Sequence, residues 1–195
     1  MRFVTTFARL LLAGGLLTSV ALQAAEISPA MLSNPCAGCH GTKGVGAGES
    51  MPSIAGLPSE YFQTTMNRFR DGQRHSTIMG RIARGYDGDE IKEMAEFFSG
   101  QQWVPAEQKT DAKLVARGKE IHLQKCEMCH ADNGRASEAT VPPLAGQWLS
   151  YLEIQLRDYR DLPDKMPAPS PMRKAIAKLS PDDLKALAHF YASQR

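Results

Sequence analysis

Two short motifs carry the residues with the clearest chemistry. Cys36 and Cys39 precede His40, and the same Cys-x-x-Cys-His spacing returns at residues 126–130. This spacing is typical of covalent c-type haem attachment. The two thiols add to the vinyl groups of one haem, and the adjacent histidine reaches the iron from the proximal side. The sequence therefore predicts two covalently bound haem c groups, attached through Cys36, Cys39, Cys126 and Cys129.

A redox dithiol and a zinc site are the other common uses of a Cys-x-x-Cys pair. A redox dithiol needs neither the histidine nor a second copy, and a zinc site needs four ligands held together. The two pairs lie ninety residues apart, and all four cysteines of the chain belong to them. No cysteine remains for a disulfide or a nucleophile, and we assign no catalytic residue to this chain.

Each haem iron needs a sixth ligand, which is methionine or histidine in electron-transfer haems. Methionines usually fill cores, but Met79 and Met172 hold matching positions, each eight residues before the N-cap of the last predicted helix of its repeat. We therefore predict that His40 and Met79 ligate the first iron, and His130 and Met172 the second. Met166, which precedes a proline, is the alternative to Met172.

Other residues recur at matching places and are candidates for contacts around the haems. Pro52 and Pro142 follow the haem histidines by twelve residues each. A backbone carbonyl there would accept the histidine Nδ1–H and orient the ring; a plain turn proline is the alternative. Four further residues either bind haem propionates or serve packing and solvation: Tyr61, Arg70, Tyr151 and Arg160.

The elements that must position these residues form one unit repeated twice. Residues 52–56 match 142–146 at a separation of ninety, and the register resumes at ninety-three after a short insertion. Two copies predict tandem domains. We place domain 1 at 26–100, a linker at 101–110 and domain 2 at 111–195.

The predicted secondary structure is helical. Asp87 and Ser180 are N-caps of matching final helices, apolar residues follow them at helical spacing, and another helix spans 111–125. Within that helix Gly118 allows a close crossing by the C-terminal helix. Each domain is small and buries little surface, so we expect the haem to be required for folding.

The N-terminus has the features of a secretory signal peptide at residues 1–25. Arg2 and Arg9 flank the start of an apolar run over 10–22, and small residues follow at Ala24 and Ala25. An uncleaved anchor is the alternative, although the run is short for a span of ~20 residues. This order of charged, apolar and small residues predicts export to a bacterial periplasm, with no membrane span after cleavage.

Composition excludes several classes of protein. Apolar residues make up 43% of the 195 residues and charged residues 23%, which argues against a disordered chain and a multi-span membrane protein. Residues 26–195 carry 21 basic and 21 acidic residues. A near-neutral chain is not a basic nucleic-acid binder, so we expect no nucleic-acid partner.

Five segments carry a resemblance to a known family. They resemble dihaem class I cytochromes c and, more closely, the cytochrome subunits of flavocytochrome c sulfide dehydrogenases. The resemblance implies an all-α fold of two tandem class I cytochrome c domains, each wrapped around one covalent haem. The segments are NPCAGCHGTKG (34–44), STIMGRIARGY (76–86), KCEMCH (125–130), LAGQWLSYL (144–152) and FYASQ (190–194).

The resemblance also implies a partner and a role. The partner is a flavoprotein subunit that carries FAD and oxidises sulfide to sulfur or polysulfide. This chain would accept the electrons and pass them to a soluble acceptor such as a small cytochrome c. It has no spare cysteine and no dinucleotide glycine motif, so we expect it not to be catalytic alone. The alternative is a free dihaem periplasmic shuttle that donates to a terminal oxidase or reductase.

A cluster of charge marks a candidate docking face around Met79. Residues 68–84 contain five arginines and a single acidic residue. Arginine and apolar anchors are enriched at protein interfaces, so this side of domain 1 is the predicted contact face for the flavoprotein, with the first haem nearest the flavin. The alternative is that the arginines neutralise propionates or are solvated. The face comprises Ile78, Arg81, Ile82 and Arg84.

Overall fold

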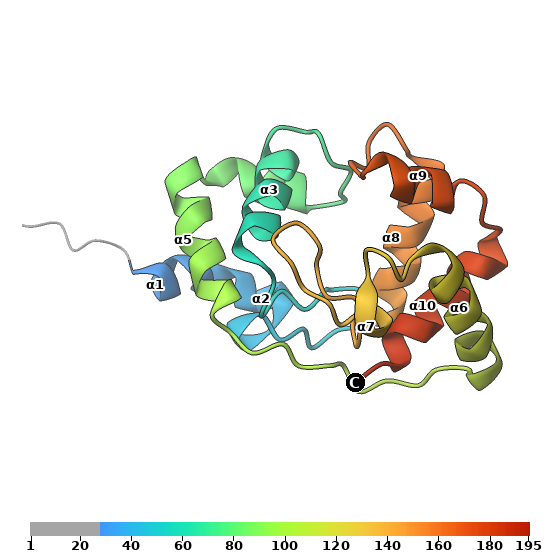
Figure 1. The fold of residues 1–195 in the computed structure, drawn as a ribbon. Helices are drawn as coiled ribbons and strands as arrows, with labels where there is room; N and C mark the ends of the chain where they lie inside the picture. The colour runs from blue at the N-terminus through green and yellow to red at the C-terminus, as the bar shows by residue number, and fades with distance from the viewer. Residues whose placement is uncertain (1–27) are drawn as a thin grey trace, which may run out of the picture.

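The computed structural model describes residues 28–195 as helices joined by loops (Figure 1). Within this range there is no strand, and only an isolated bridge joins Glu138 to Val141. The helical prediction is therefore confirmed. The predicted signal peptide lies outside the described residues. No helix within 28–195 is long and apolar enough to cross a membrane.

The first half begins with short helical pieces that contain the first motif and continues with two longer helices. Its elements are α1 (Pro29–Ser33), η1 (Asn34–Cys36), α2 (Ala37–His40), η2 (Thr42–Gly44), α3 (Ser59–Arg70), α4 (Met79–Ile82), η3 (Ala83–Gly85) and α5 (Gly88–Ser99). The second half contains α6 (Ala112–Lys125), α7 (Ala131–Gly134), α8 (Leu149–Asp161), α9 (Ser170–Ile176) and α10 (Pro181–Ser193).

Capping boxes fix the start of the last helix in each half. The Asp87 side chain accepts a hydrogen bond from the Glu90 backbone N–H at 2.9 Å, and the Glu90 carboxylate accepts one from the Asp87 N–H at 2.9 Å. Ser180 and Asp183 make the same reciprocal pair at 3.1 and 3.0 Å. Each box satisfies two backbone donors that a helix otherwise leaves free, so both predicted N-caps are confirmed.

Each half packs its own apolar cluster. In the first half Phe62 of α3 stacks on Phe98 of α5, with ring centroids 5.4 Å apart. In the second half α6 packs against α10. A Cβ added to Gly118 would stand 2.1 Å from the Ala186 carbonyl oxygen, so only glycine allows this approach. The close crossing predicted at Gly118 is confirmed.

The repeat is visible in the loop after each motif. The Gly44 carbonyl accepts hydrogen bonds from the backbone N–H groups of residues 54 and 55, at 2.8 and 3.0 Å. The Gly134 carbonyl accepts the equivalent bonds from residues 144 and 145, at 2.8 and 3.0 Å. Both glycines have positive φ, 82° and 84°, which glycine adopts without steric cost. The same turn therefore follows each motif.

Buried polar contacts join the two halves. The Gln147 side-chain oxygen accepts a bond from the Ser53 N–H at 2.9 Å, and its amide nitrogen donates to the Ser53 carbonyl at 3.0 Å. We call this pair the Ser53–Gln147 clamp. The Trp148 indole donates to the Gly46 carbonyl at 3.1 Å. The connection at 101–110 runs along both halves (Figure 1), and the indole of Trp103 within it donates to the Ala145 carbonyl at 2.9 Å.

Candidate haem sites

The first motif lies on consecutive helical turns, η1 and α2. Cys36 is half-buried and packs against the first apolar cluster, whereas Cys39 is exposed. A separation of three residues puts the two thiols on neighbouring positions of one helical face. Both are free. They are thus available for two bonds to one planar group.

His40 ends α2 and is 8% exposed. Its Nδ1 lies 2.8 Å from the Pro52 carbonyl oxygen. A ring that donates its Nδ1–H to this carbonyl keeps Nε2 free to ligate a metal. Burial lowers the pKa of His40, so the imidazole is neutral at neutral pH, as a metal ligand must be. The structure therefore forms in the first half the contact predicted for Pro52.

The second motif lacks one of the hydrogen bonds that the first motif has. Cys126 is half-buried against the second cluster and Cys129 is exposed. Burial, followed by the nearby His122, lowers the pKa of His130. The His130 Nδ1 is buried without a hydrogen-bond partner among the described residues. The contact predicted for the Pro142 carbonyl is thus not formed, and the two halves differ at this point.

The methionines differ in their surroundings. Met79 opens α4 and packs against the same cluster as Cys36. Met172, in α9, packs against the same cluster as Cys126. Met166 is fully buried in the loop before α9 and is not part of that cluster. The packing therefore favours Met172 over Met166 as the residue that shares a site with Cys126.

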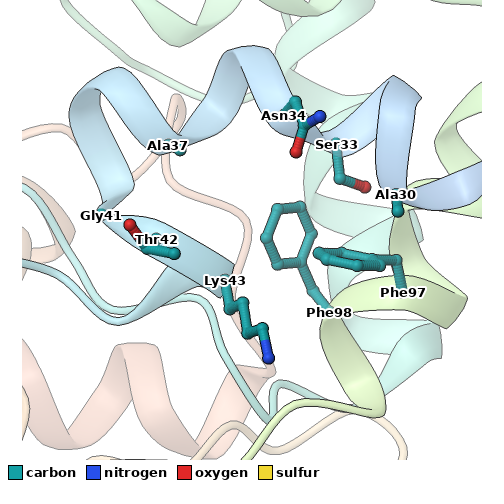
Figure 2. Close-up of a pocket in the computed structure, with 9 residues that line it drawn as sticks. All are labelled: Ala30, Ser33, Asn34, Ala37, Gly41, Thr42, Lys43, Phe97 and Phe98. Atoms are coloured by element: carbon teal, nitrogen blue, oxygen red, sulfur yellow. The ribbon is translucent and has the colours of Figure 1, made fainter.

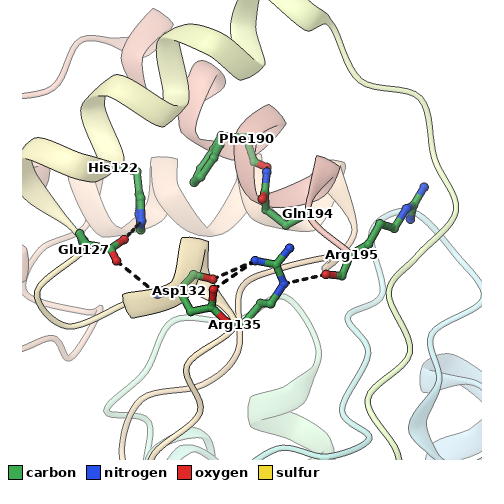
Figure 3. Close-up of polar contacts among 7 residues, drawn as sticks. All are labelled: His122, Glu127, Asp132, Arg135, Phe190, Gln194 and Arg195. Carbon is green, nitrogen blue, oxygen red and sulfur yellow. Dashed lines mark hydrogen bonds and ion pairs between the residues drawn. The ribbon is translucent and has the colours of Figure 1, made fainter.

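A buried histidine, His122, supports the second motif through hydrogen bonds. The spacing of the motif alone did not predict this role. The ring of His122 lies inside the second half, with Nδ1 at 2.9 Å from the Tyr191 hydroxyl. Its Nε2 hydrogen-bonds the Glu127 carboxylate, which also accepts the Asp132 N–H at 3.3 Å (Figure 3). These contacts tie α6, the motif loop, α7 and α10 together. The available sequence signal is a histidine one turn before the motif and a glutamate inside it.

The recurring tyrosines and the recurring arginines lie in different surroundings in the structure. Arg70 and Arg160 each pair with the following aspartate, at 2.9 and 2.6 Å. Tyr61 and Tyr151 instead lie beside Arg74, a buried arginine with no counterpart in the repeat. Spacing alone offered no signal for Arg74.

A hollow of about 250 Å³ lies beside the first motif (Figure 2). Phe97 and Phe98 form one wall, and seven residues of the segment from α1 to η2 form the rest. Neither His40 nor Met79 lines it. Within 28–195, no three His, Cys, Asp or Glu side chains gather where they could hold a metal ion.

The residues present fit covalent haem c. Each motif offers two unpaired thiols and a neutral histidine, and each half packs a methionine against the cluster that its first cysteine also contacts. In the first half the Pro52 carbonyl lies within hydrogen-bond distance of the His40 Nδ1, which leaves Nε2 free to ligate a metal.

Comparison with known proteins shows similarity across both halves. Residues 115–194 match the Cytochrome c family. The chain is 30% identical over 168 residues to a thiosulfate dehydrogenase electron acceptor of Stutzerimonas stutzeri, covering 81% of this chain and 78% of the relative. It is 50% identical over 68 residues to the cytochrome subunit of sulfide dehydrogenase of Chlorobaculum tepidum, covering 35% of this chain and 61% of that protein.

A solved structure shares the fold over nearly the whole described chain. Reduced recombinant cytochrome c4 from Pseudomonas stutzeri superposes with a TM-score of 0.77 at 24% identity. The match covers 86% of this chain and 97% of the other. This likeness concerns the fold.

Proposed function

Because the chain belongs to the cytochrome c family, as a dihaem c-type electron-transfer protein, we propose that it is the cytochrome subunit of a periplasmic sulfide dehydrogenase. In this role it accepts electrons from an FAD-containing flavoprotein subunit that oxidises sulfide to sulfur or polysulfide, and a soluble cytochrome c receives them. The observation that carries the proposal is the 50% identity over 68 residues to a cytochrome subunit of sulfide dehydrogenase.

The proposal assigns a role to each motif residue. Covalent haem c supplies reversible one-electron chemistry when it is bound. The motif cysteines would hold one haem in each half, domain 1 being 26–100 and domain 2 being 111–195. His40 and His130 would ligate the irons on one side. Burial keeps both rings neutral, and the Pro52 carbonyl fixes the orientation of His40. Met79 and Met172 would close the other side and exclude water.

The methionine assignment makes a spectroscopic prediction. Met172→Leu keeps the side-chain volume, so packing changes little, but it removes the sulfur. We expect the oxidised protein to lose the near-infrared sulfur-to-iron band of one haem, and Met79→Leu to remove that of the other. Met166→Leu is the matched control and should retain both bands. Loss of a band in Met166→Leu, with none in Met172→Leu, would move the second ligand to Met166.

Copurification tests the function directly. We expect the chain, isolated from its native cells, to be bound to a flavoprotein that contains FAD. Sulfide should reduce both haems rapidly in that complex and slowly in the chain alone. Rapid reduction of the isolated chain, or recovery of the chain without any flavin, would reject the subunit role.

A free electron carrier is the second candidate, and one observation favours it. The relative that covers 81% of this chain is an electron acceptor of thiosulfate dehydrogenase. A free carrier would be isolated without a flavoprotein and would donate to a terminal oxidase or reductase. The copurification experiment separates these two roles.

Docking is proposed at the face formed by Ile78, Arg81, Ile82 and Arg84. Ile78 and Ile82 are 47% and 38% exposed and lie four residues apart. Both arginines are exposed as well. The face therefore combines apolar anchors with positive charge along α4 and η3, the segment that contains Met79.

Charge reversal at this face should weaken the flavoprotein complex. For Arg81→Glu with Arg84→Glu we expect Kd to rise about tenfold or more at low salt, which corresponds to about 1.4 kcal/mol, and the effect should shrink as salt screens it. The visible spectrum should not change. Lys119→Glu with Lys185→Glu, on exposed positions of α6 and α10, is the control with the same change of net charge. Equal affinities for the two double variants would reject this face.

A further inference from the structure

Arg74 lies at the boundary between the two halves. Among the described lysines and arginines it is the most buried. It is 6% exposed and follows α3 in the first half. Its Nη2 donates to the Gln155 side-chain oxygen of α8, in the second half, at 2.8 Å. The guanidinium lies 5.3 Å from the ring centroid of Phe69 and 5.8 Å from that of Tyr159. Its Nε is buried and has no hydrogen-bond partner among residues 28–195.

No anion of the described chain neutralises this charge. Within residues 28–195 Arg74 makes no ion pair, whereas Arg70 and Arg160 each have an aspartate. Its neighbours are the hydroxyls of Tyr61, Tyr151 and Tyr159. Burial raises the pKa of Tyr151 and Tyr159, so these hydroxyls are neutral. Buried charges in proteins are paired, because an unpaired one loses its hydration without compensation. The position therefore calls for an anion that residues 28–195 do not supply.

The surroundings of Arg74 reach both candidate haem sites. Tyr61 and Phe69 pack against the first cluster, which Cys36 and Met79 also contact. On the other side Tyr159 packs against the second cluster, which Cys126 and Met172 also contact. A backbone hydrogen bond also joins the two halves next to Arg74, because the His75 N–H donates to the Lys165 carbonyl at 2.8 Å.

We propose that Arg74 is a shared counter-ion for the propionate carboxylates of the haems in both halves, and that its charge raises the reduction potentials of both. The inference rests on the dihaem part of the proposed function and is independent of the sulfide dehydrogenase role. Carboxylates are the natural partners of a guanidinium, which offers several donors in a fixed fork. A cation held between the two haem sites would disfavour the oxidised, more positive form of each iron. Arg74 would therefore raise both reduction potentials, and position 164, its equivalent in the repeat, is an aspartate.

Spectroelectrochemical titration of the holoprotein tests this role. In Arg74→Gln we expect the reduction equilibrium constant of each haem to fall about tenfold, which is about 59 mV for a one-electron couple. Arg74→Lys keeps the charge but loses the fork, and we expect a smaller decrease at both haems. Arg117→Gln removes an arginine that is paired with Asp183 on the surface and should move neither potential.

The outcomes are distinguishable. Fewer than two haems in the mass of the wild-type protein would reject the dihaem assignment and this inference with it. Two haems with unmoved potentials in Arg74→Gln would reject the role of Arg74 alone. If Arg74→Gln does not accumulate, Arg74→Lys decides, and unchanged potentials in that variant overturn the inference. Exchange of chloride for phosphate at constant ionic strength should leave the wild-type potentials unchanged; a shift that Arg74→Gln abolishes would assign the site to a soluble anion and reject the propionates.

Discussion

Loss of both thiols of the second motif, in Cys126→Ala with Cys129→Ala, is expected to leave residues 111–195 without a cooperative fold. Cys126 packs against the cluster that α6 and α10 build, and α9 carries Met172 onto the same cluster. A covalent group ligated by His130 and Met172 would tie the motif loop to α9, although α7, α8 and the loops beside them separate the two segments in the chain. A domain this small has little burial to replace such a link.

Mass spectrometry and thermal melting measure this loss. The variant should carry one haem, and the melting transition of the second half should disappear while that of the first remains. Met128→Ala is the control inside the same motif, because Met128 is 86% exposed, and it should keep both haems and both transitions. A cooperative melt of the second half without its haem would contradict the prediction.

A methyl group at position 118 is expected to disrupt the second half almost as severely. In Gly118→Ala the new Cβ would stand 2.1 Å from the Ala186 carbonyl oxygen and 2.6 Å from the Phe190 Cβ. The nearest atom belongs to the backbone of a buried helix and cannot move aside alone, so α6 and α10 must separate. Overpacking of this kind costs about 3 kcal/mol or more, which lowers the Tm of a domain this size by roughly 12 °C or more.

Gly88→Ala is the matched control for the same substitution. Gly88 is the first residue of α5, and an added Cβ there meets nothing within 4 Å. Alanine is the better helix former, so this variant should be as stable as the wild type or slightly more stable in urea unfolding. Gly118→Ala with wild-type stability would show that the crossing of α6 and α10 adjusts freely.

The parts of the fold that could be predicted from the sequence depend on residues close together in the chain. The caps at Asp87 and Ser180 are local hydrogen bonds. Gly118 was the exception that reached further, because a glycine on the apolar face of a helix indicates a close neighbour even when that neighbour is unknown. The motif chemistry is also local, since three residues define it.

The rest depends on which distant residues the packing brings together. Arg74 meets Gln155 across 81 positions, and Ser53 meets Gln147 across 94. No periodicity encodes such pairs. The internal repeat did not predict every contact correctly. It predicted a carbonyl contact at both Pro52 and Pro142, and the structure forms only the first. Equal spacing in the two halves does not ensure equal packing, since each loop meets different neighbours.

The Ser53–Gln147 clamp implies that the contact between the halves is not the same in both directions, although the equivalent positions His75 and Lys165 meet across it. In a symmetric pair of identical units each contact occurs twice, once in each direction. The repeat places Pro143 where the first half has Ser53, and Leu57 where the second half has Gln147. Pro143 has no N–H and Leu57 has no amide, so the reciprocal clamp cannot form. Two copies of either half could not form this clamp, so the contact depends on residues that only the two different halves together supply.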